Sequence, residues 1–245
     1  MCPLATEPGE LLEAKVVKSP DTLAVQWSLR LVGAFVLVAG VLWLSSWTLD
    51  YWHAAVYLLA LFVPVAVVSI ALLARKPAAI KRLITVELNR SQRALNSAFR
   101  PLFILMMFVP GLDHRFGLSH TIIGAVSLPV TVICDMLIVT AVLLAGWVLN
   151  VNEFAGRSIR VEHDQPLITK GPYSIVRHPL YSASLMLWLV TPLALGSWVA
   201  LPLFVLLIPF YVLRLMNEEL VLNRDLRGYA AYCKRTRYRL IPWVW

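Results

Sequence analysis

The chain has 245 residues, of which 59% are hydrophobic and only 15% are charged, and its mean hydropathy is +0.73. Soluble domains usually carry about 25% charged residues, so this composition excludes an ordinary water-soluble globular domain. The formal net charge is +8, and the basic residues stand between apolar runs. Attraction to anionic lipid headgroups explains such charge more simply than nucleic-acid binding does.

Residues 1–26 are expected to form a short cytosolic lead. They are more acidic than basic, and they lack the cationic start and short apolar core of a cleaved signal peptide. The three cysteines of the chain show neither a CxxC pair nor a zinc-ligand spacing, and we interpret them as reduced thiols.

Six apolar runs follow, each near the length of about 20 residues that a helix needs to cross a bilayer. The third run is interrupted by Arg100-Pro101, and the last two are short and meet at Gly196-Ser197 as a tight helical hairpin. The sequence therefore predicts an all-α integral membrane protein with about six transmembrane helices. The runs are Trp27–Leu49, Tyr51–Ala74, Ala94–Leu112, Thr121–Leu149, Leu180–Leu195 and Trp198–Leu213.

Basic residues dominate the 75–100 loop and the C-terminal tail, which by the positive-inside rule face the cytoplasm. Six crossings then put both termini on that side. Within the loop, Ala78–Phe99 is expected to lie along the interface as an amphipathic helix. The polar stretch Gly111–His120 is expected to be an external turn. Its two histidines have no third ligand nearby, so no metal site is predicted.

Three regions result: the lead (1–26), a transmembrane region with its basic loop (27–149), and a polar, turn-rich segment with the hairpin and tail (150–245). In the last region, Pro179 disfavours helix at His178 and suits the first turn of the helix that follows. The sequence "RHPLY" therefore caps the hairpin at the membrane surface. A plain interfacial anchor, with a snorkelling Arg177 and a belt Tyr181, is the alternative.

Arg214, Glu218 and Glu219 stand near the end of the last apolar run. Arg214 and Glu218 share a helix face, and ionisable groups near membrane depth usually line a cavity or have a partner. The alternative is a surface ion pair on a helix that emerges into water. Because a hairpin brings its two ends to one surface, these residues are expected beside Arg177 and His178.

The stretch "GPYSIVRHPLY", the hairpin, and then "RLMNEELVL…GYAAYCKRTRYRLIP" resemble the isoprenylcysteine carboxyl methyltransferase family, whose pattern phospholipid methyltransferases share. The resemblance covers roughly residues 150–245. It implies a multi-pass membrane enzyme that uses S-adenosylmethionine without a Rossmann domain, and no G-x-G-x-x-G follows a strand here. One departure is Ala183, where the family often has a glycine that would permit close backbone approach.

The resemblance also implies site residues in a pocket on the cytoplasmic side. Arg214 maps to the arginine that contacts the methyl acceptor, and Arg177 is a second candidate for holding it. A carboxylate acceptor needs such a cation, whereas an amine would need a base, for which Glu219 is the nearest candidate. The cofactor-binding candidates are Gln165, Pro166, Leu167, Ile168, Tyr173, His178, Pro179, Leu180, Tyr181 and Glu218.

The expected function is thus methylation of a carboxyl or other nucleophile on a lipophilic or lipidated substrate, of which an isoprenylcysteine is one option. Two other classes stay open. A transporter or membrane scaffold would account for the helices, and Asp135, lying mid-span, would be a proton site or a structural contact. An NADPH-dependent sterol reductase shares a related C-terminal hairpin.

Overall fold

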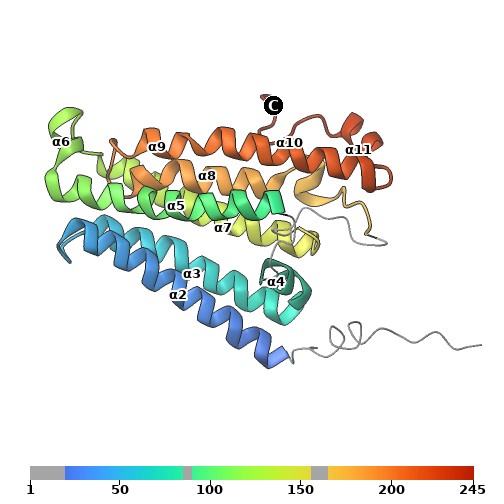
Figure 1. Ribbon diagram of the computed structural model, residues 1–245, viewed down its shortest axis with the longest axis horizontal. Helices are drawn as coiled ribbons and strands as arrows, with labels where there is room; N and C mark the ends of the chain where they lie inside the picture. The colour runs from blue at the N-terminus through green and yellow to red at the C-terminus, as the bar shows by residue number, and fades with distance from the viewer. Residues whose placement is uncertain (1–19, 85–89, 156–164) are drawn as a thin grey trace, which may run out of the picture.

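The computed structural model describes residues 20–84, 90–155 and 165–245, with the backbone alone for 20–21 and 90–100 (Figure 1). In these ranges the chain is helical and contains no strand, which confirms the predicted all-α class. Most of the N-terminal lead and residues 85–89 of the basic loop lie outside the described residues.

The described helices follow the order of the predicted apolar runs. A short 3-10 turn, η1, precedes the hairpin at Gly171–Ser174. The helices are α2 (Pro20–Ser46), α3 (Trp52–Arg75), α4 (Pro77–Ile84), α5 (Arg90–Phe116), α6 (Leu118–Ile122), α7 (Leu128–Val151), α8 (Pro179–Ala194), α9 (Leu201–Val205), α10 (Leu207–Asp225) and α11 (Tyr229–Arg235).

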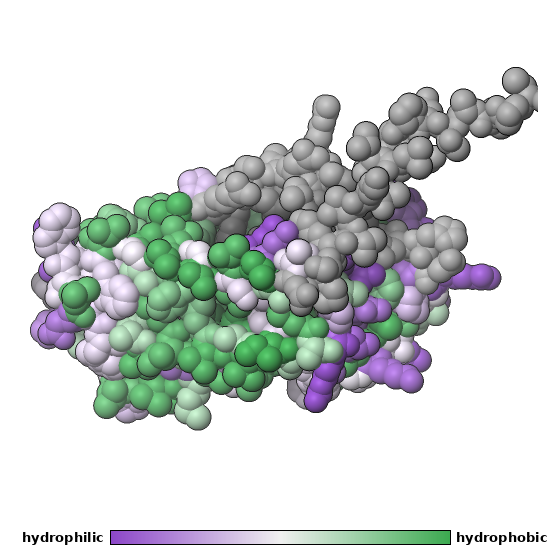
Figure 2. All heavy atoms as spheres, turned by 90° about the horizontal axis from the view of Figure 1, so that it is seen from below, coloured by the Kyte–Doolittle hydropathy of each residue, from purple (hydrophilic) through white to green (hydrophobic). Residues whose placement is uncertain are grey.

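Four helical stretches of the described chain are long and apolar enough to cross a membrane: α2, α3, α7, and α9 together with α10. Helix α8 is also apolar but has only 16 residues. Many large apolar side chains of these helices are exposed. Figure 2 shows a broad hydrophobic band with hydrophilic residues at both ends, as expected of a lipid-facing surface. The total of six crossings stays a prediction.

Successive long helices run in opposite directions (Figure 1). The start of α2, helix α4 and helix α11 lie at one end of the bundle, and α6 lies at the other. The described part of the 75–100 loop and the C-terminal region therefore share one side, which is the arrangement that the charge pattern required. Which side faces the cytoplasm remains an expectation.

Helix α7 packs against α3 and α8, and α2 packs against α5. Two glycines allow the close approaches. A Cβ added at Gly111 of α5 would lie 1.8 Å from Oγ of Ser45 in α2, and one at Gly146 of α7 would lie 2.7 Å from a methyl carbon of Val68 in α3. Small residues at helix contacts are a common way to pack helices in membranes.

One local prediction was wrong, and another is not tested. The interfacial helix expected over 78–99 stays a prediction, because residues 85–89 lie outside the described residues, between α4 (Pro77–Ile84) and the start of α5 at Arg90. The external turn expected over 111–120 is largely helical, since α5 continues through Pro110 to Phe116 and α6 follows at Leu118. Proline inside a membrane helix is tolerated when neighbouring groups satisfy the freed backbone.

A polar clasp closes the end of the bundle that carries α6. The buried carboxylate of Asp113 accepts hydrogen bonds from the Ser119 backbone N–H, at 2.6 Å, and from the hydroxyls of Ser119 and Ser197. The Ser119 hydroxyl in turn accepts the N–H of Trp198 at 2.8 Å. The clasp holds the predicted Gly196-Ser197 hairpin turn against α5 and α6. Gly196 in this turn has a φ of 74°.

Candidate functional site

The start of α8 is set by the sequence Arg177-His178-Pro179. His178 is the N-cap, with non-helical backbone angles (φ −125°, ψ 62°), and Pro179 occupies the first helical position, as predicted. The backbone N–H groups of Arg177 and His178 donate to the carbonyls of Tyr238 and Arg239, at 2.9 and 3.0 Å. The C-terminal tail therefore holds the cap of α8 in place.

Helix α10 presents Arg214 and Glu218 towards this cap. The Tyr181 hydroxyl, one turn into α8, donates to Oε2 of Glu218 and accepts from Nε of Arg214 at 3.0 Å. Nδ1 of His178 lies 3.9 Å from Oε1 of Glu218. The two sequence clusters thus converge, because the hairpin returns α10 to the level at which α8 begins.

Glu219 points to a different set of partners. Its Oε1 accepts from Nη1 of Arg177 at 2.6 Å and lies 3.3 Å from Nε2 of His178, and its Oε2 accepts from Nε of Arg239 at 3.0 Å. The Glu219 side chain is only 8% exposed. Two guanidinium groups hold this carboxylate, which favours its ionised form and occupies its lone pairs.

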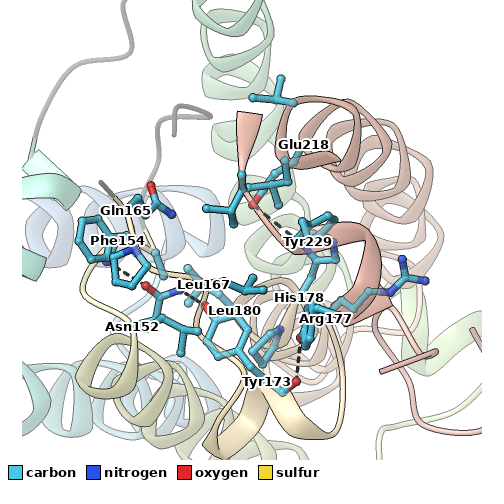
Figure 3. A pocket seen from close by; sticks show the side chains of 18 of the residues that line it. Asn152, Phe154, Gln165, Leu167, Tyr173, Arg177, His178, Leu180, Glu218 and Tyr229 are labelled. Atoms are coloured by element: carbon cyan, nitrogen blue, oxygen red, sulfur yellow. Dashed lines mark hydrogen bonds and ion pairs between the residues drawn. The ribbon is translucent and has the colours of Figure 1, made fainter. Parts of the chain in front are cut away.

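A pocket opens between the cap of α8, the end of α7 and the C-terminal half of α10 (Figure 3). It encloses about 830 Å³, counted out to its open mouth. Arg177 also lines it, whereas Arg214 and Glu219 lie behind its wall. All ten residues predicted to bind the cofactor line it: Gln165, Pro166, Leu167, Ile168, Tyr173, His178, Pro179, Leu180, Tyr181 and Glu218.

Sequence reasoning missed the other part of the wall. Tyr229 and Tyr232 come from α11, and their i, i+3 spacing in "GYAAYC" is a signal for one helix face. Asn152 caps the end of α7 and Phe154 follows it, where the chain changes from apolar to polar. The remaining lining residues are Ala155, Val221, Leu222 and Leu226.

The tyrosines of the pocket outside the membrane helices are neutral hydrogen-bonding groups. Burial raises the pKa of Tyr232 to about 12, and also raises the pKa of Tyr173 and of Tyr229, the last with help from the negative charge of Glu219. The Tyr173 hydroxyl accepts from Nδ2 of Asn152 at 2.9 Å, and the Tyr232 hydroxyl donates to the Tyr173 carbonyl at 2.7 Å. These bonds tie α7, η1 and α11 together around the pocket.

The pocket lining combines the Glu218 carboxylate, the Arg177 guanidinium and the His178 imidazole with amide and phenol groups and an apolar wall of leucines. Such a lining suits a ligand with both a cationic and an aromatic part, since carboxylates and aromatic rings attract cations. Within the described side chains, no group of three or more His, Cys, Asp or Glu residues could hold a metal ion.

Residues 123–227 match the model of the phospholipid methyltransferase family. This methyltransferase-type segment is similar to phospholipid methyltransferases. This match confirms the relationship to membrane methyltransferases expected from the motifs, over somewhat less than half of the chain. It begins upstream of the boundary expected at residue 150, so helix α7 belongs to the methyltransferase-type segment, and it ends before the tyrosines of α11.

The chain is also similar to a solved structure of a eukaryotic intramembrane Ras methyltransferase, an isoprenylcysteine carboxyl methyltransferase. The identity is 20%, the alignment covers 90% of this chain and 86% of that chain, and the TM-score is 0.36. At this TM-score the similarity does not establish a shared arrangement of helices. No curated protein matches the chain in sequence.

Proposed function

We propose that this protein is a membrane-embedded, S-adenosylmethionine-dependent methyltransferase that acts on a lipophilic acceptor. The observation that carries the proposal is the pocket at the His178 cap. Ten residues expected from the motifs to bind the cofactor lie around one cavity, and most of that cavity belongs to the methyltransferase-type segment.

The lining fits this cofactor. Glu218, with 27% of its side chain exposed, is available to the pocket and would accept hydrogen bonds from the ribose or an amino group. The rings of Tyr173 and Tyr181 would pack on the adenine or face the sulfonium. Gln165, with the three residues after it, would close the opposite side. When bound, the cofactor supplies a methyl group on a sulfonium that is already activated for transfer.

Arg214 is proposed to orient the acceptor. Its side chain is buried and donates from Nε to the Tyr181 hydroxyl, which holds the guanidinium in a fixed position beside the pocket wall. A guanidinium holds a carboxylate through two parallel hydrogen bonds, which suits a carboxyl acceptor. Arg177 is the second candidate, although its Nη1 atom already donates to Glu219.

The residues of the site supply position and desolvation more than acid–base chemistry. A carboxylate acceptor is deprotonated at neutral pH, so fixing it in line with the donor supplies much of the rate. Glu219 was the candidate base for an amine acceptor. Its bonds to Arg177 and Arg239 argue for a positioning role instead, in which it holds the cap of α8.

The decisive experiment measures ligand binding and turnover on the full chain in lipid nanodiscs. Saturable binding of S-adenosylhomocysteine, with transfer of a labelled methyl group to a lipid-extractable product, supports the proposal. Binding of NADPH in its place would favour the reductase class. Binding of neither, with a correctly folded protein, would favour a transporter or scaffold.

A further inference from the structure

A second, shallower hollow lies beside the C-terminal tail and shares no residue with the main pocket. One wall comes from the η1 turn and the segment after it, and the other comes from the end of α11 and the tail. The hollow is lined by, among others, Ile175, Arg235, Arg237, Tyr238 and Trp243.

Two arginines make one half of this hollow cationic. Arg235 and Arg237 are both exposed. Within the described ranges, neither guanidinium forms an ion pair: Asp225 is paired with Arg224, and Glu219 with other cations. The two charges are therefore available to an anion from outside the chain.

The other half of the hollow is apolar and faces outwards. Trp243 is 85% exposed and Val244 is 75% exposed, and Ile175 and Ile241 beside them are more than half exposed. Ile175 and Trp243 line the hollow together with the two arginines, and Ile241 and Val244 adjoin Trp243 in the tail. Together they form an amphipathic surface, which is costly in water and suits a membrane interface.

The packing of the tail places this surface at the edge of the apolar layer. Leu240 and Trp245 pack with Leu215 of α10. On either side of that contact along α10, Leu213 and Leu220 are 65% and 70% exposed, as lipid-facing residues are. The tail thus packs beside a part of α10 that exposes leucines, which is where we expect the apolar layer of the bilayer to end and the headgroups to begin.

We propose that this hollow binds an anionic phospholipid of the surrounding bilayer. Arg235 and Arg237 hold the phosphate, for which guanidinium groups are well suited, while Trp243 and Ile175 lie along the upper acyl chain. The site is separate from the proposed methyl-transfer pocket, since the two share no lining residue.

The hollow is connected to the main pocket through backbone hydrogen bonds. The Arg237 carbonyl accepts from Nη2 of Arg177 at 3.0 Å, and the Tyr238 carbonyl accepts from the Arg177 N–H at 2.9 Å. A lipid that orders residues 235–238 therefore also orders Arg177 at the cap of α8.

The test uses the full chain in phosphatidylcholine nanodiscs with spin-labelled phosphatidylglycerol or spin-labelled phosphatidylcholine, and measures the motionally restricted fraction by electron paramagnetic resonance. The protein is expected to prefer phosphatidylglycerol several-fold. Arg235→Gln with Arg237→Gln should lower that preference towards one. Trp243→Asn should lower it partly, and asparagine tolerates the φ of 63° at this position.

The matched control removes two charges elsewhere on the same side, by Arg75→Gln with Lys76→Gln at the end of α3. It should leave most of the preference intact. An equal loss in the control and in the hollow variant means general charge attraction and overturns the proposal. Displacement of the restricted lipid by excess glycerol phosphate also overturns it, because the site then takes a soluble phosphate. Circular dichroism of each variant verifies that the helices are retained.

Discussion

Nδ1 of His178 and Oε1 of Glu218 lie 3.9 Å apart, although one residue caps α8 and the other belongs to α10. Both side chains line the same pocket. The hairpin turn at the far end of the bundle produces this proximity, because it returns α10 to the level where α8 begins. Removing the charge of Glu218 is therefore the most direct test of the site.

Glu218→Gln is expected to weaken S-adenosylhomocysteine binding by about 10- to 100-fold, the equivalent of one charge-assisted hydrogen bond of roughly 1.5–3 kcal/mol. Isothermal titration calorimetry in detergent or nanodiscs measures the change. Asp225→Asn is the matched control, because this exposed carboxylate lies on the same helix and, among the described residues, pairs with Arg224. Unchanged affinity in Glu218→Gln would contradict the assigned role.

Arg214→Lys is expected to lower kcat/KM for the methyl acceptor by about 100-fold or more while the affinity for S-adenosylhomocysteine changes little. Lysine keeps the charge but loses the planar fork, and a small misplacement of a reacting group has an effect of this size. Arg224→Lys serves as control, since that side chain is 74% exposed. If cofactor affinity and turnover fall together, Arg214 supports the pocket wall through Tyr181 and does not hold the acceptor.

The sequence predicted the pocket wall well where the chemistry is local. Pro179 directly after His178 fixes the start of α8, and the spacing of Arg214 and Glu218 fixes a common face on α10. Given a hairpin between them, the two clusters had to meet. The part of the pocket wall that was not predicted, Tyr229 and Tyr232 of α11, depends on how the chain turns after Asp225, and no local sequence pattern determines this turn.

Long-range polar contacts could not be predicted from the sequence for the same reason. Nothing near Glu219 indicates that Arg239 will reach it, since this contact depends on the tail pairing its backbone with residues 177–178. Asp113 looked like part of an external turn, because its two serine partners come from separate elements. The sign and position of these charges could be predicted, but their partners could not.

Glu219→Gln is expected to destabilise the protein by roughly 3–5 kcal/mol, because Arg177 and Arg239 would then keep their charges without their shared carboxylate. Thermal unfolding in a fixed detergent measures the loss. Arg239→Gln removes one partner only and should cost less, since Arg239 is 27% exposed. A stable Glu219→Gln protein with an altered pH–rate profile would restore the general-base role.

Asp135→Asn is expected to leave both folding and methyl transfer nearly unchanged. Asp135 is buried in α7, and within the described residues neither of its oxygens has a hydrogen-bond partner. Asparagine has nearly the same shape and no charge to desolvate. Methyl transfer assays on the variant check this, and a loss of turnover in a folded protein would indicate that the carboxyl exchanges a proton during function.

Asp113→Asn is expected to lower the free energy of unfolding by about 1–3 kcal/mol without affecting cofactor binding at the opposite end of the bundle. The Asp113 carboxylate accepts from one backbone N–H and two serine hydroxyls, and an asparagine amide would replace one of these acceptors by a donor. Chemical unfolding gives the loss, and S-adenosylhomocysteine titration below the unfolding range gives the affinity. His120→Ala, at the neighbouring exposed position on α6, should change neither quantity. If Asp113→Asn instead weakens binding while stability is retained, the hairpin turn transmits its position to the His178 cap, and the clasp would be a positioning element of the site.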